Sequence, residues 1–253
     1  MFSKLTFIQN LNSPVHPSWD EFVNNMFDEL ANIEKDLDVN GNYTPKKNKI
    51  LHFLTLDLTK CKIIILGQDP YPQKGIATGR AFEVGNLKSW HEKFSNISLK
   101  NIIRAIYYAY YNKYLKYSEI VTMIHDSPQL FNENEFAILP PNKLFKNWEQ
   151  QGVLLLNTSF TCEIGIPGSH GFIWKNFTLK LLEYIAEINK NLIWFLWGNH
   201  AIEITSGIKI KNKYESMHPM MCYEGKDRNN DFLFGKINHF FETKDIINWV
   251  GKQ

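Results

Sequence analysis

Three short, uninterrupted apolar runs constrain the fold of this 253-residue chain more than any other feature. Runs of this kind, with helical patterns between them, are typical of parallel strands that are covered on both faces. A fourth, weaker candidate follows the third run. The four segments are Ile63-Ile64-Ile65-Leu66, Val153-Leu154-Leu155-Leu156, Leu192-Ile193-Trp194-Phe195-Leu196-Trp197 and Tyr214 to Met217. We therefore predict an α/β fold whose central four-stranded, parallel, twisted sheet is flanked by helices.

Each predicted strand runs directly into polar residues. The four continuations are Gly67-Gln68-Asp69-Pro70-Tyr71-Pro72, Asn157-Thr158, Gly198-Asn199-His200 and His218-Pro219. Because ligands of parallel sheets bind beyond the carboxyl ends of the strands, we expect Asp69, Asn157 and His218 to converge. Two prolines fix the backbone around Asp69, which suits a carboxylate that must be held in place, although Asp-Pro pairs also occur in ordinary turns.

Helical patterns fill the gaps between the predicted strands. Ser18-Trp19-Asp20-Glu21 has the form of a capping box, and Ser98 is a second candidate helix cap. Apolar stripes at helical spacing follow both, and another precedes the third strand; we interpret them as core-facing. Residues 120–150 contain three prolines and predict a long connection of undefined shape.

Length and composition bound the domain organisation. A chain of 253 residues can form one large α/β domain or two smaller ones. It has no Ser/Gly-rich linker, internal repeat or low-complexity tract, which favours one domain over residues 1–253. The net charge of +2 neither requires nor excludes a nucleic-acid partner, since a local patch is enough.

The cysteines and the N-terminus bear on cellular location. Cys61, Cys162 and Cys222 are widely spaced and form neither a disulfide framework nor a metal motif, which indicates a reducing compartment. The N-terminus lacks the apolar stretch of a signal peptide, and no run approaches the ~20 residues of a membrane helix. We expect a cytoplasmic protein without membrane association.

Missing motifs argue against several chemistries. The histidines and cysteines show no ligand spacing for zinc and no cysteine set for an iron–sulfur cluster. No Gly-rich phosphate loop follows a predicted strand, which argues against nucleotide hydrolysis. We therefore predict neither a metal nor a cofactor.

Eight fragments, in order, resemble motifs of the uracil-DNA glycosylase family. They are Gly67-Gln68-Asp69-Pro70-Tyr71, Gly79-Arg80-Ala81-Phe82, Ser98-Leu99-Lys100-Asn101-Ile102, residues 151–158, Ser169-His170, Leu196-Trp197-Gly198, His218-Pro219, and Phe234-Gly235 through His239-Phe240. Each fragment is weak alone, but eight in the family's order are specific. The resemblance spans roughly residues 50 to 250. It implies a family-like core over 51–250, preceded by a helical region over 1–50.

The resemblance implies hydrolysis of the bond between uracil and deoxyribose in DNA, which leaves an abasic site for base excision repair. Asp69 is expected to orient the attacking water and stabilise the cationic sugar. His218 is expected to act as a neutral imidazole that donates to O2 of the departing uracil. No Lys lies within a motif as a Schiff-base nucleophile, so we expect a monofunctional enzyme that does not cleave the strand.

The same resemblance assigns the base-reading residues. The amide of Asn157 offers one donor and one acceptor, which match O4 and N3–H of uracil but not the reverse pattern of cytosine. Phe82 is expected to stack on the extruded base. Tyr71 is expected to lie against C5 and exclude the methyl group of thymine. Backbone groups near Gln68 complete the pocket. Taken singly, Asn157 and His218 also suit turn caps, and Phe82 suits a core.

DNA contacts are where the chain departs from the family pattern. Ser98, Ser206 of Ser206-Gly207, Met220 and Met221 are the candidate contacts. The family's Ser-Pro-Leu-Ser is replaced by Met220-Met221-Cys222-Tyr223, any of which can be the apolar wedge. Pro72 stands where the family usually has a His. The cations Lys209, Lys211, Lys213, Lys226 and Arg228 near the His218 loop suit either phosphate contact or a solvated surface.

Two functional hypotheses follow from these features. The first is a uracil-DNA glycosylase. The second is a catalytically weak or single-strand-preferring relative that serves replication as a DNA-binding accessory factor; the altered wedge loop and Pro72 motivate it, whereas the joint presence of Asp69, Tyr71, Asn157 and His218 argues against it. The expected partner is uracil-containing DNA, single- or double-stranded, and the protein is expected to be a monomer. A small acidic protein that mimics DNA is a further possible partner.

Overall fold

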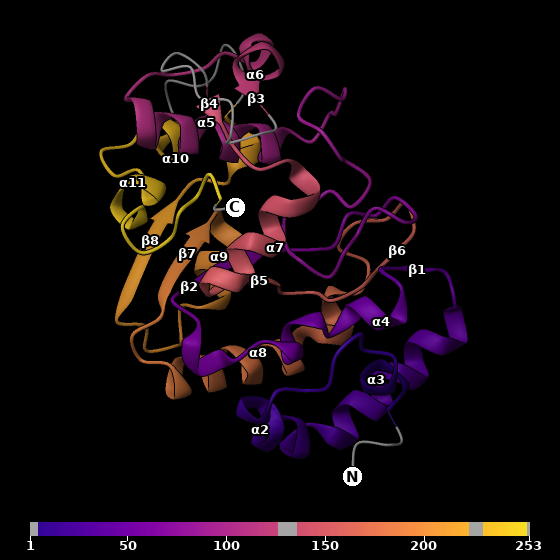
Figure 1. Ribbon diagram of the computed structural model, residues 1–253. Helices are drawn as coiled ribbons and strands as arrows, with labels where there is room; N and C mark the ends of the chain where they lie inside the picture. Colours follow the sequence, from indigo (N-terminus) through magenta and orange to yellow (C-terminus); the bar gives the residue numbers. More distant parts are fainter. Residues whose placement is uncertain (1–4, 126–135, 223–229, 252–253) are drawn as a thin grey trace.

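The computed structural model describes residues 5–125, 136–222 and 230–251 (Figure 1). Its central sheet contains four strands in the order β5-β2-β7-β8, and every neighbouring pair is parallel. The strands are β2 (Ile63–Gly67), β5 (Val153–Asn157), β7 (Ile193–Trp197) and β8 (Asn212–Ser216). This confirms the predicted α/β fold with a four-stranded parallel sheet. The fourth strand lies a little earlier than predicted and ends before Met217.

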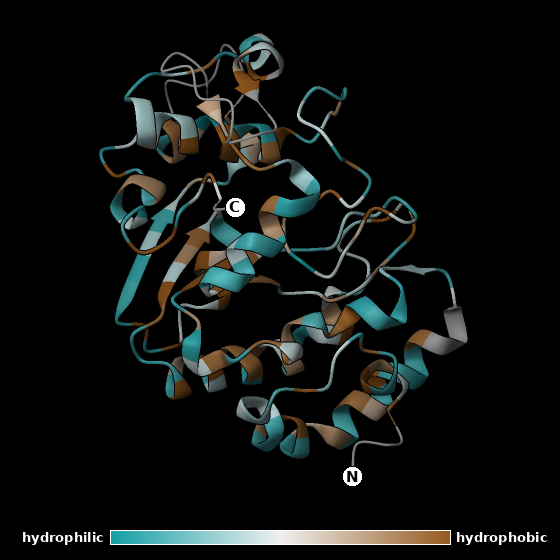
Figure 2. Cartoon of the chain, viewed as in Figure 1, coloured by the Kyte–Doolittle hydropathy of each residue, from teal (hydrophilic) through white to brown (hydrophobic). Residues whose placement is uncertain are grey.

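Strands β2, β5 and β7 are apolar on both faces because each face of the sheet is covered by helices. Alternate residues of each strand point to opposite sides. Ile63, Ile65, Val153, Leu155, Phe195 and Trp197 belong to one core cluster, and Ile64, Leu66, Leu154, Leu156, Trp194 and Leu196 belong to the other. Edge strand β8 alternates instead between exposed and partly buried side chains, and it is the most hydrophilic strand of the sheet in Figure 2.

The helices divide between the two faces of the sheet. One core cluster takes apolar residues from α1 (Thr6–Gln9), α2 (Asp20–Asn25), α3 (Phe27–Asn40), α4 (Lys47–Ile50), α8 (Gly171–Ile188) and α9 (Asn199–Ile204). The other takes them from α5 (Ile97–Tyr111), α6 (Tyr117–Met123), α7 (Pro141–Gln151), α10 (Asp231–Phe234) and α11 (His239–Thr243). Figure 1 shows α2, α3 and α8 on one side of the sheet and α5, α7 and α11 on the other.

Short elements complete the described chain. The two-stranded pairs are β1 (Tyr43–Thr44) with β6 (Cys162–Glu163), and β3 (Ile124–His125) with β4 (Phe136–Ala137). The 3₁₀ turns are η1 (Pro17–Trp19), η2 (His52–Thr55), η3 (Leu58–Lys60) and η4 (Pro219–Met221). Within the described ranges, no helix is long and apolar enough to cross a membrane.

Both predicted serine caps are wrong. Helix α2 begins at Asp20, after the turn η1, and Ser18 lies within that turn. The Ser18 hydroxyl instead accepts a hydrogen bond from the Leu58 N–H at 3.0 Å, a tertiary contact that uses the oxygen expected to cap the helix. Helix α5 begins at Ile97, which places Ser98 in its first turn rather than before it.

Helix α7 occupies a segment that was predicted as part of a long connection. It has Pro141 at its first position and Gly152 at φ 101° just after its end, a pairing that defines many helix boundaries. Leu144, Phe145 and Trp148 form its buried face. The start and stop signals were therefore present in the sequence, and the nearby prolines concealed them. Residues 126–135 of the connection lie outside the described residues.

Candidate active site

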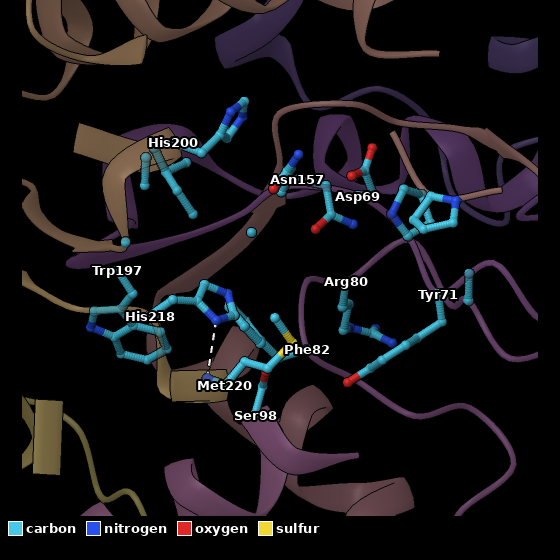
Figure 3. A pocket seen from close by; sticks show the side chains of 18 of the residues that line it. Asp69, Tyr71, Arg80, Phe82, Ser98, Asn157, Trp197, His200, His218 and Met220 are labelled. Carbon is cyan, nitrogen blue, oxygen red and sulfur yellow. Dashed lines mark hydrogen bonds between the residues drawn. The ribbon is translucent and has the colours of Figure 1, made fainter. Parts of the chain in front are cut away.

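A cavity of about 380 Å³, here called the main cavity, opens at the carboxyl ends of the sheet (Figure 3). Its wall includes residues that follow all four strands, as the strand-end argument predicts. Asp69 and Tyr71 follow β2, Asn157 ends β5, Trp197 and His200 come from the end of β7 and the start of α9, and His218 and Met220 follow β8. Phe82, Arg80, Ser98 and Gln68 complete the part of the wall that concerns the predicted site.

The ends of β2 and β5 fit together around Asn157. Gly67 pairs in register with Asn157, and a Cβ atom at Gly67 would lie 2.4 Å from Asn157 Oδ1. Only glycine therefore leaves room for the amide. The ladder continues past the sheet, because the N–H groups of Thr158 and Ser159 donate to the carbonyls of Gly67 (3.0 Å) and Gln68 (2.9 Å). This pairing holds the backbone that leads into Asp69.

Asp69 is a half-buried carboxylate. Burial raises its pKa, opposed by the charge of His200 and by a hydrogen bond from the Gly168 N–H. Its Oδ1 is buried and has no hydrogen-bond partner among the described residues. Gly168 belongs to a loop that Ser169 holds, since its hydroxyl accepts the Glu163 N–H and donates to the Ile166 carbonyl, both at 2.8 Å. The Ser169-His170 motif thus supports the backbone donor of Asp69.

His218 is held in a defined tautomer. The Met220 N–H donates to His218 Nδ1 at 3.1 Å (dashed line in Figure 3). Nδ1 is therefore an acceptor, and the proton of the neutral imidazole lies on Nε2. Burial lowers the pKa of His218, which favours this neutral form. The ring packs against the end of β7, where a Cβ at Gly198 (φ 87°) would lie 2.8 Å from His218 Cβ.

Aromatic side chains line the cavity on either side. The Phe82 ring lies 5.4 Å from Trp197 and 5.9 Å from His218, centroid to centroid. The Phe82 backbone has φ 65°, a left-handed conformation that is uncommon outside glycine. Burial raises the pKa of Tyr71 to about 12, although a hydrogen bond with Asn96 opposes the shift. The Tyr71 phenol therefore stays protonated at neutral pH.

Asn101 anchors the loop that carries His218 and Met220, a role not foreseen from the sequence. Its amide nitrogen donates to the carbonyls of Pro219 (2.7 Å) and Cys222 (2.5 Å). Arg104 in turn donates to Asn101 Oδ1 at 3.0 Å, and both side chains are buried. The signal was an Asn on the apolar face of the predicted helix after Ser98, within a motif that resembles the family.

His200 is a second residue with an unforeseen role. The Thr158 hydroxyl donates to the Gln68 carbonyl at 3.1 Å, so it accepts from His200 Nε2 at 2.7 Å. His200 is exposed and also lines a second cavity of about 580 Å³, which shares Gln68, Asp69 and His200 with the main cavity. The sequence signal was a polar residue just beyond the third strand.

The predicted DNA contacts separate in space. Ser98 and Met220 line the main cavity, and Met220 is 52% exposed. Met221 is 43% exposed but lies outside that wall. Ser206 lies beside the second cavity, where its hydroxyl donates to the Glu203 carbonyl at 2.8 Å. Cys222 is fully buried, so it is wrong as a wedge candidate. Tyr223 lies outside the described residues.

Among the described residues, the expected cluster of cations around the His218 loop does not form. Lys209 and Lys211 precede β8, so the whole strand separates them from His218 at its other end. Their predicted position near this loop was wrong, because strand β8 lies between these lysines and the loop and keeps them at its opposite ends. Lys213 is paired with Glu215 at 2.6 Å. Lys226 and Arg228 lie outside the described residues. The described ranges contain no cluster of acidic, His and Cys side chains that could hold a metal ion.

Comparisons with known proteins identify the family. The model of the uracil DNA glycosylase superfamily matches residues 55–242. The chain is 32% identical over 236 residues to a uracil-DNA glycosylase of Buchnera aphidicola subsp. Cinara cedri, with 87% of each chain covered. It is 31% identical to uracil-DNA glycosylase 1 of Listeria monocytogenes serovar 1/2a, over 92% of this chain and 96% of that one. The chain belongs to the uracil-DNA glycosylase superfamily.

Solved structures share the fold. The wild-type UNG of Nitratifractor salsuginis superposes with a TM-score of 0.70 at 21% identity, over 99% of this chain and 97% of that one. A mimivirus UNG variant, solved in complex with UGI, gives a TM-score of 0.63 at 22% identity, over 84% of this chain and 72% of that one.

Proposed function

We propose that this protein is a monofunctional uracil-DNA glycosylase, which hydrolyses the N-glycosidic bond of deoxyuridine in DNA and leaves an abasic site. The observation that carries the proposal is the presence, in one cavity, of a partly desolvated carboxylate, a base-reading amide and a neutral imidazole with a defined proton. These are Asp69, Asn157 and His218. Each of these three groups serves one part of the reaction, as follows.

Asp69 activates water and stabilises the sugar. Bond cleavage develops positive charge on the deoxyribose, and a fixed carboxylate beside it lowers the energy of that state. The Asp69 carboxylate lines the main cavity, where it can accept a hydrogen bond from the attacking water. The Gly168 N–H holds the carboxylate while the reaction proceeds.

His218 stabilises the leaving group. The departing uracil carries negative charge on O2, and Nε2–H of the neutral imidazole is the donor that meets it. A neutral donor needs no change of protonation on the way to the transition state. The lowered pKa of His218 keeps the imidazole neutral at physiological pH.

Specificity comes from the walls of the main cavity. Asn157 pairs with N3–H and O4 of uracil, and cytosine leaves both groups unpaired, at roughly 1–3 kcal/mol each. The Phe82 ring stacks on the base, and Tyr71 lies where the methyl group of thymine would have to fit. The Gln68 backbone, fixed by Ser159, supplies the remaining polar contacts.

Met220 is the residue we assign as the wedge. It is exposed, lies at the rim of the main cavity and follows His218 by two positions, so it can enter the space that an extruded nucleotide leaves. Ser98 lies beside Met220 in Figure 3 and is our candidate for a contact with the DNA backbone. We expect action on single- and double-stranded DNA by a cytoplasmic monomer, and binding of an acidic, DNA-mimicking inhibitor protein at the same cleft.

The test is uracil release from matched single-stranded and duplex oligonucleotides that carry one uracil, without added metal. Release of free uracil, with strand breaks only after alkali, supports the proposal. Asp69→Asn serves as the inactive control. If the wild type binds both substrates and releases no base from either, the protein acts as a DNA-binding accessory factor instead.

A further inference from the structure

A buried ion-pair cluster brackets Phe82. Arg80 Nη1 contacts Glu83 Oε2 at 3.0 Å, so this pair spans the short segment at whose centre Phe82 lies. Arg80 Nη2 contacts Glu149 Oε2 of α7 at 2.7 Å. His52 Nε2 contacts Glu149 Oε1 at 3.0 Å. The cluster thereby ties the Phe82 segment to two elements that are distant in sequence.

We propose that Arg80 and Glu83, anchored through Glu149, are positioning residues that hold the Phe82 ring in place for stacking on the extruded base. The inference rests on the proposed function for the identity of the base. It concerns residues that do not touch the reacting atoms, and it assigns them a part in how tightly the base is bound.

The backbone of Phe82 explains why such a device is needed. Its φ of 65° lies in the left-handed region, which a bulky side chain occupies only when its surroundings impose it. The segment begins at Gly79, which is itself at φ 91°. The left-handed backbone at Phe82 makes the direction of its ring depend on contacts that restrain the segment from outside. The Arg80–Glu83 pair is such a restraint.

Because its side chains are largely buried, the ion pairs of the cluster are strong enough to restrain the Phe82 segment. The exposed fractions of the side chains are 16% for Arg80, 8% for Glu83 and 6% for Glu149, so salt and solvent screen these pairs little. Burial opposes ionisation of Glu149, but the hydrogen bond from His52 and the charge of Arg80 outweigh it and lower the pKa of its carboxyl. The Glu149 carboxyl therefore stays ionised at neutral pH.

The cluster is better suited to orientation than to stability. Arg80 Nε is buried and has no hydrogen-bond partner among the described residues. A buried ion pair with incomplete hydrogen bonding adds little net stability compared with apolar side chains of similar volume. Its planar, two-armed geometry does, however, fix directions, since one guanidinium joins two carboxylates from different elements.

A double-mutant cycle tests the proposal. Glu83→Gln breaks the pair across Phe82 while Arg80 keeps Glu149. We expect it to raise the inhibition constant of free uracil and the KM for a single-stranded uracil oligonucleotide by about 5- to 20-fold, with kcat within about twofold, a shift equivalent to roughly 1–2 kcal/mol. In a Phe82→Ala background the same substitution should change either constant by less than about twofold, because its effect passes through the ring.

Glu183→Gln is the matched control, because Lys180 and Glu183 have the same spacing and charge but are exposed. It should change neither constant. The proposal is overturned if Glu83→Gln has the same effect with and without the Phe82 ring, or no effect with it. Arg80→Lys keeps one charge without the two-armed geometry, and it should reproduce the loss if Glu83→Gln folds poorly.

A readout independent of catalysis separates this inference from the proposed function. With 4-fluorophenylalanine incorporated, the Phe82 ¹⁹F resonance can be assigned by its loss in Phe82→Leu. It should shift or broaden in Glu83→Gln and not in Glu183→Gln, because Trp197 lies 5.4 Å away and its ring current reports small displacements. An unchanged resonance would refute the positioning role, whereas absence of uracil release by the wild type would refute only the proposed function.

Discussion

The Met220 backbone N–H donates to Nδ1 of His218 across 3.1 Å, so the residue assigned as the wedge also determines which imidazole nitrogen carries the proton. The two properties belong to different parts of Met220, since the side chain is exposed at the cavity rim and the N–H points inward. Substitutions that remove one part and keep the other can therefore separate base extrusion from leaving-group stabilisation.

Met220→Ala and Met220→Pro exploit this separation. Alanine keeps the N–H and loses the wedge, so we expect duplex activity to fall by about 10-fold or more with little change on single strands, where no stack has to be opened. Proline removes the N–H as well, and both activities should fall. Single-turnover rates on matched substrates measure the difference, and equal losses in the two variants would contradict the role of the N–H.

Asp69→Asn should reduce turnover by two to four orders of magnitude, on the scale of an acid–base group in the transition state. The amide has nearly the shape of the carboxylate but neither its charge nor its basicity. DNA binding, measured by fluorescence anisotropy with a non-cleavable analogue, should stay within a few-fold of wild type. Turnover close to wild type would mean that another group activates the water.

Tyr71→Ala should admit thymine. The Tyr71 ring lines the main cavity, and in the proposed function it excludes the 5-methyl group, so its removal should open space for that group. The variant should release thymine slowly from oligonucleotides and lose part of its uracil activity, while wild type releases none. The measurement is base release by chromatography. A variant that still spares thymine would show that another residue excludes the methyl group.

Asn157→Asp should weaken discrimination against cytosine. A protonated carboxyl can present its donor and acceptor in either order, whereas an amide has one fixed donor group and one fixed acceptor. We expect detectable cytosine release and a loss of uracil activity of about 10-fold or more, equivalent to one or two hydrogen bonds. Unchanged selectivity in the ratio of kcat/KM values would place base reading elsewhere.

His239 should make stability depend on pH. Burial lowers its pKa from 6.5 to about 4, against the opposing charge of Asp231, and the ring accepts the Trp197 indole N–H at 2.9 Å. The imidazole is neutral in both states above pH 6.5. Below that, the unfolded chain binds a proton that the folded chain resists, so the free energy of unfolding should fall by up to about 3 kcal/mol between pH 6.5 and pH 4.

The control for this pH effect is His239→Gln, which keeps an acceptor for Trp197 and cannot titrate. Urea unfolding at several pH values should give a shallower loss of stability for the variant than for wild type over that window. Parallel curves for the two proteins would assign the acid sensitivity to other groups.

Strand-end reasoning predicted much of the candidate site because it depends only on topology. Asp69, Asn157 and His218 are far apart in the chain, yet each follows a parallel strand, and parallel strands end at one edge. The pairings of Arg80 with Glu149 and of Asn101 with Pro219 could not be predicted this way, since they join elements whose relative placement only tertiary packing decides. Ser18 failed as a cap for the same reason.

The Asn101 amide donates hydrogen bonds to the carbonyls of Pro219 and Cys222, on either side of Met220 and Met221 in the His218 loop. It makes no hydrogen bond with the two methionines themselves. The Asn101 contacts use backbone carbonyl groups alone, so they do not depend on the side chains of Met220 and Met221. A change of side chain at Met220 or Met221 that keeps the backbone N–H of Met220 therefore also keeps the hydrogen bond to His218 Nδ1. If Met220 is the wedge, as proposed, its side chain can differ between relatives while the imidazole of His218 keeps its position.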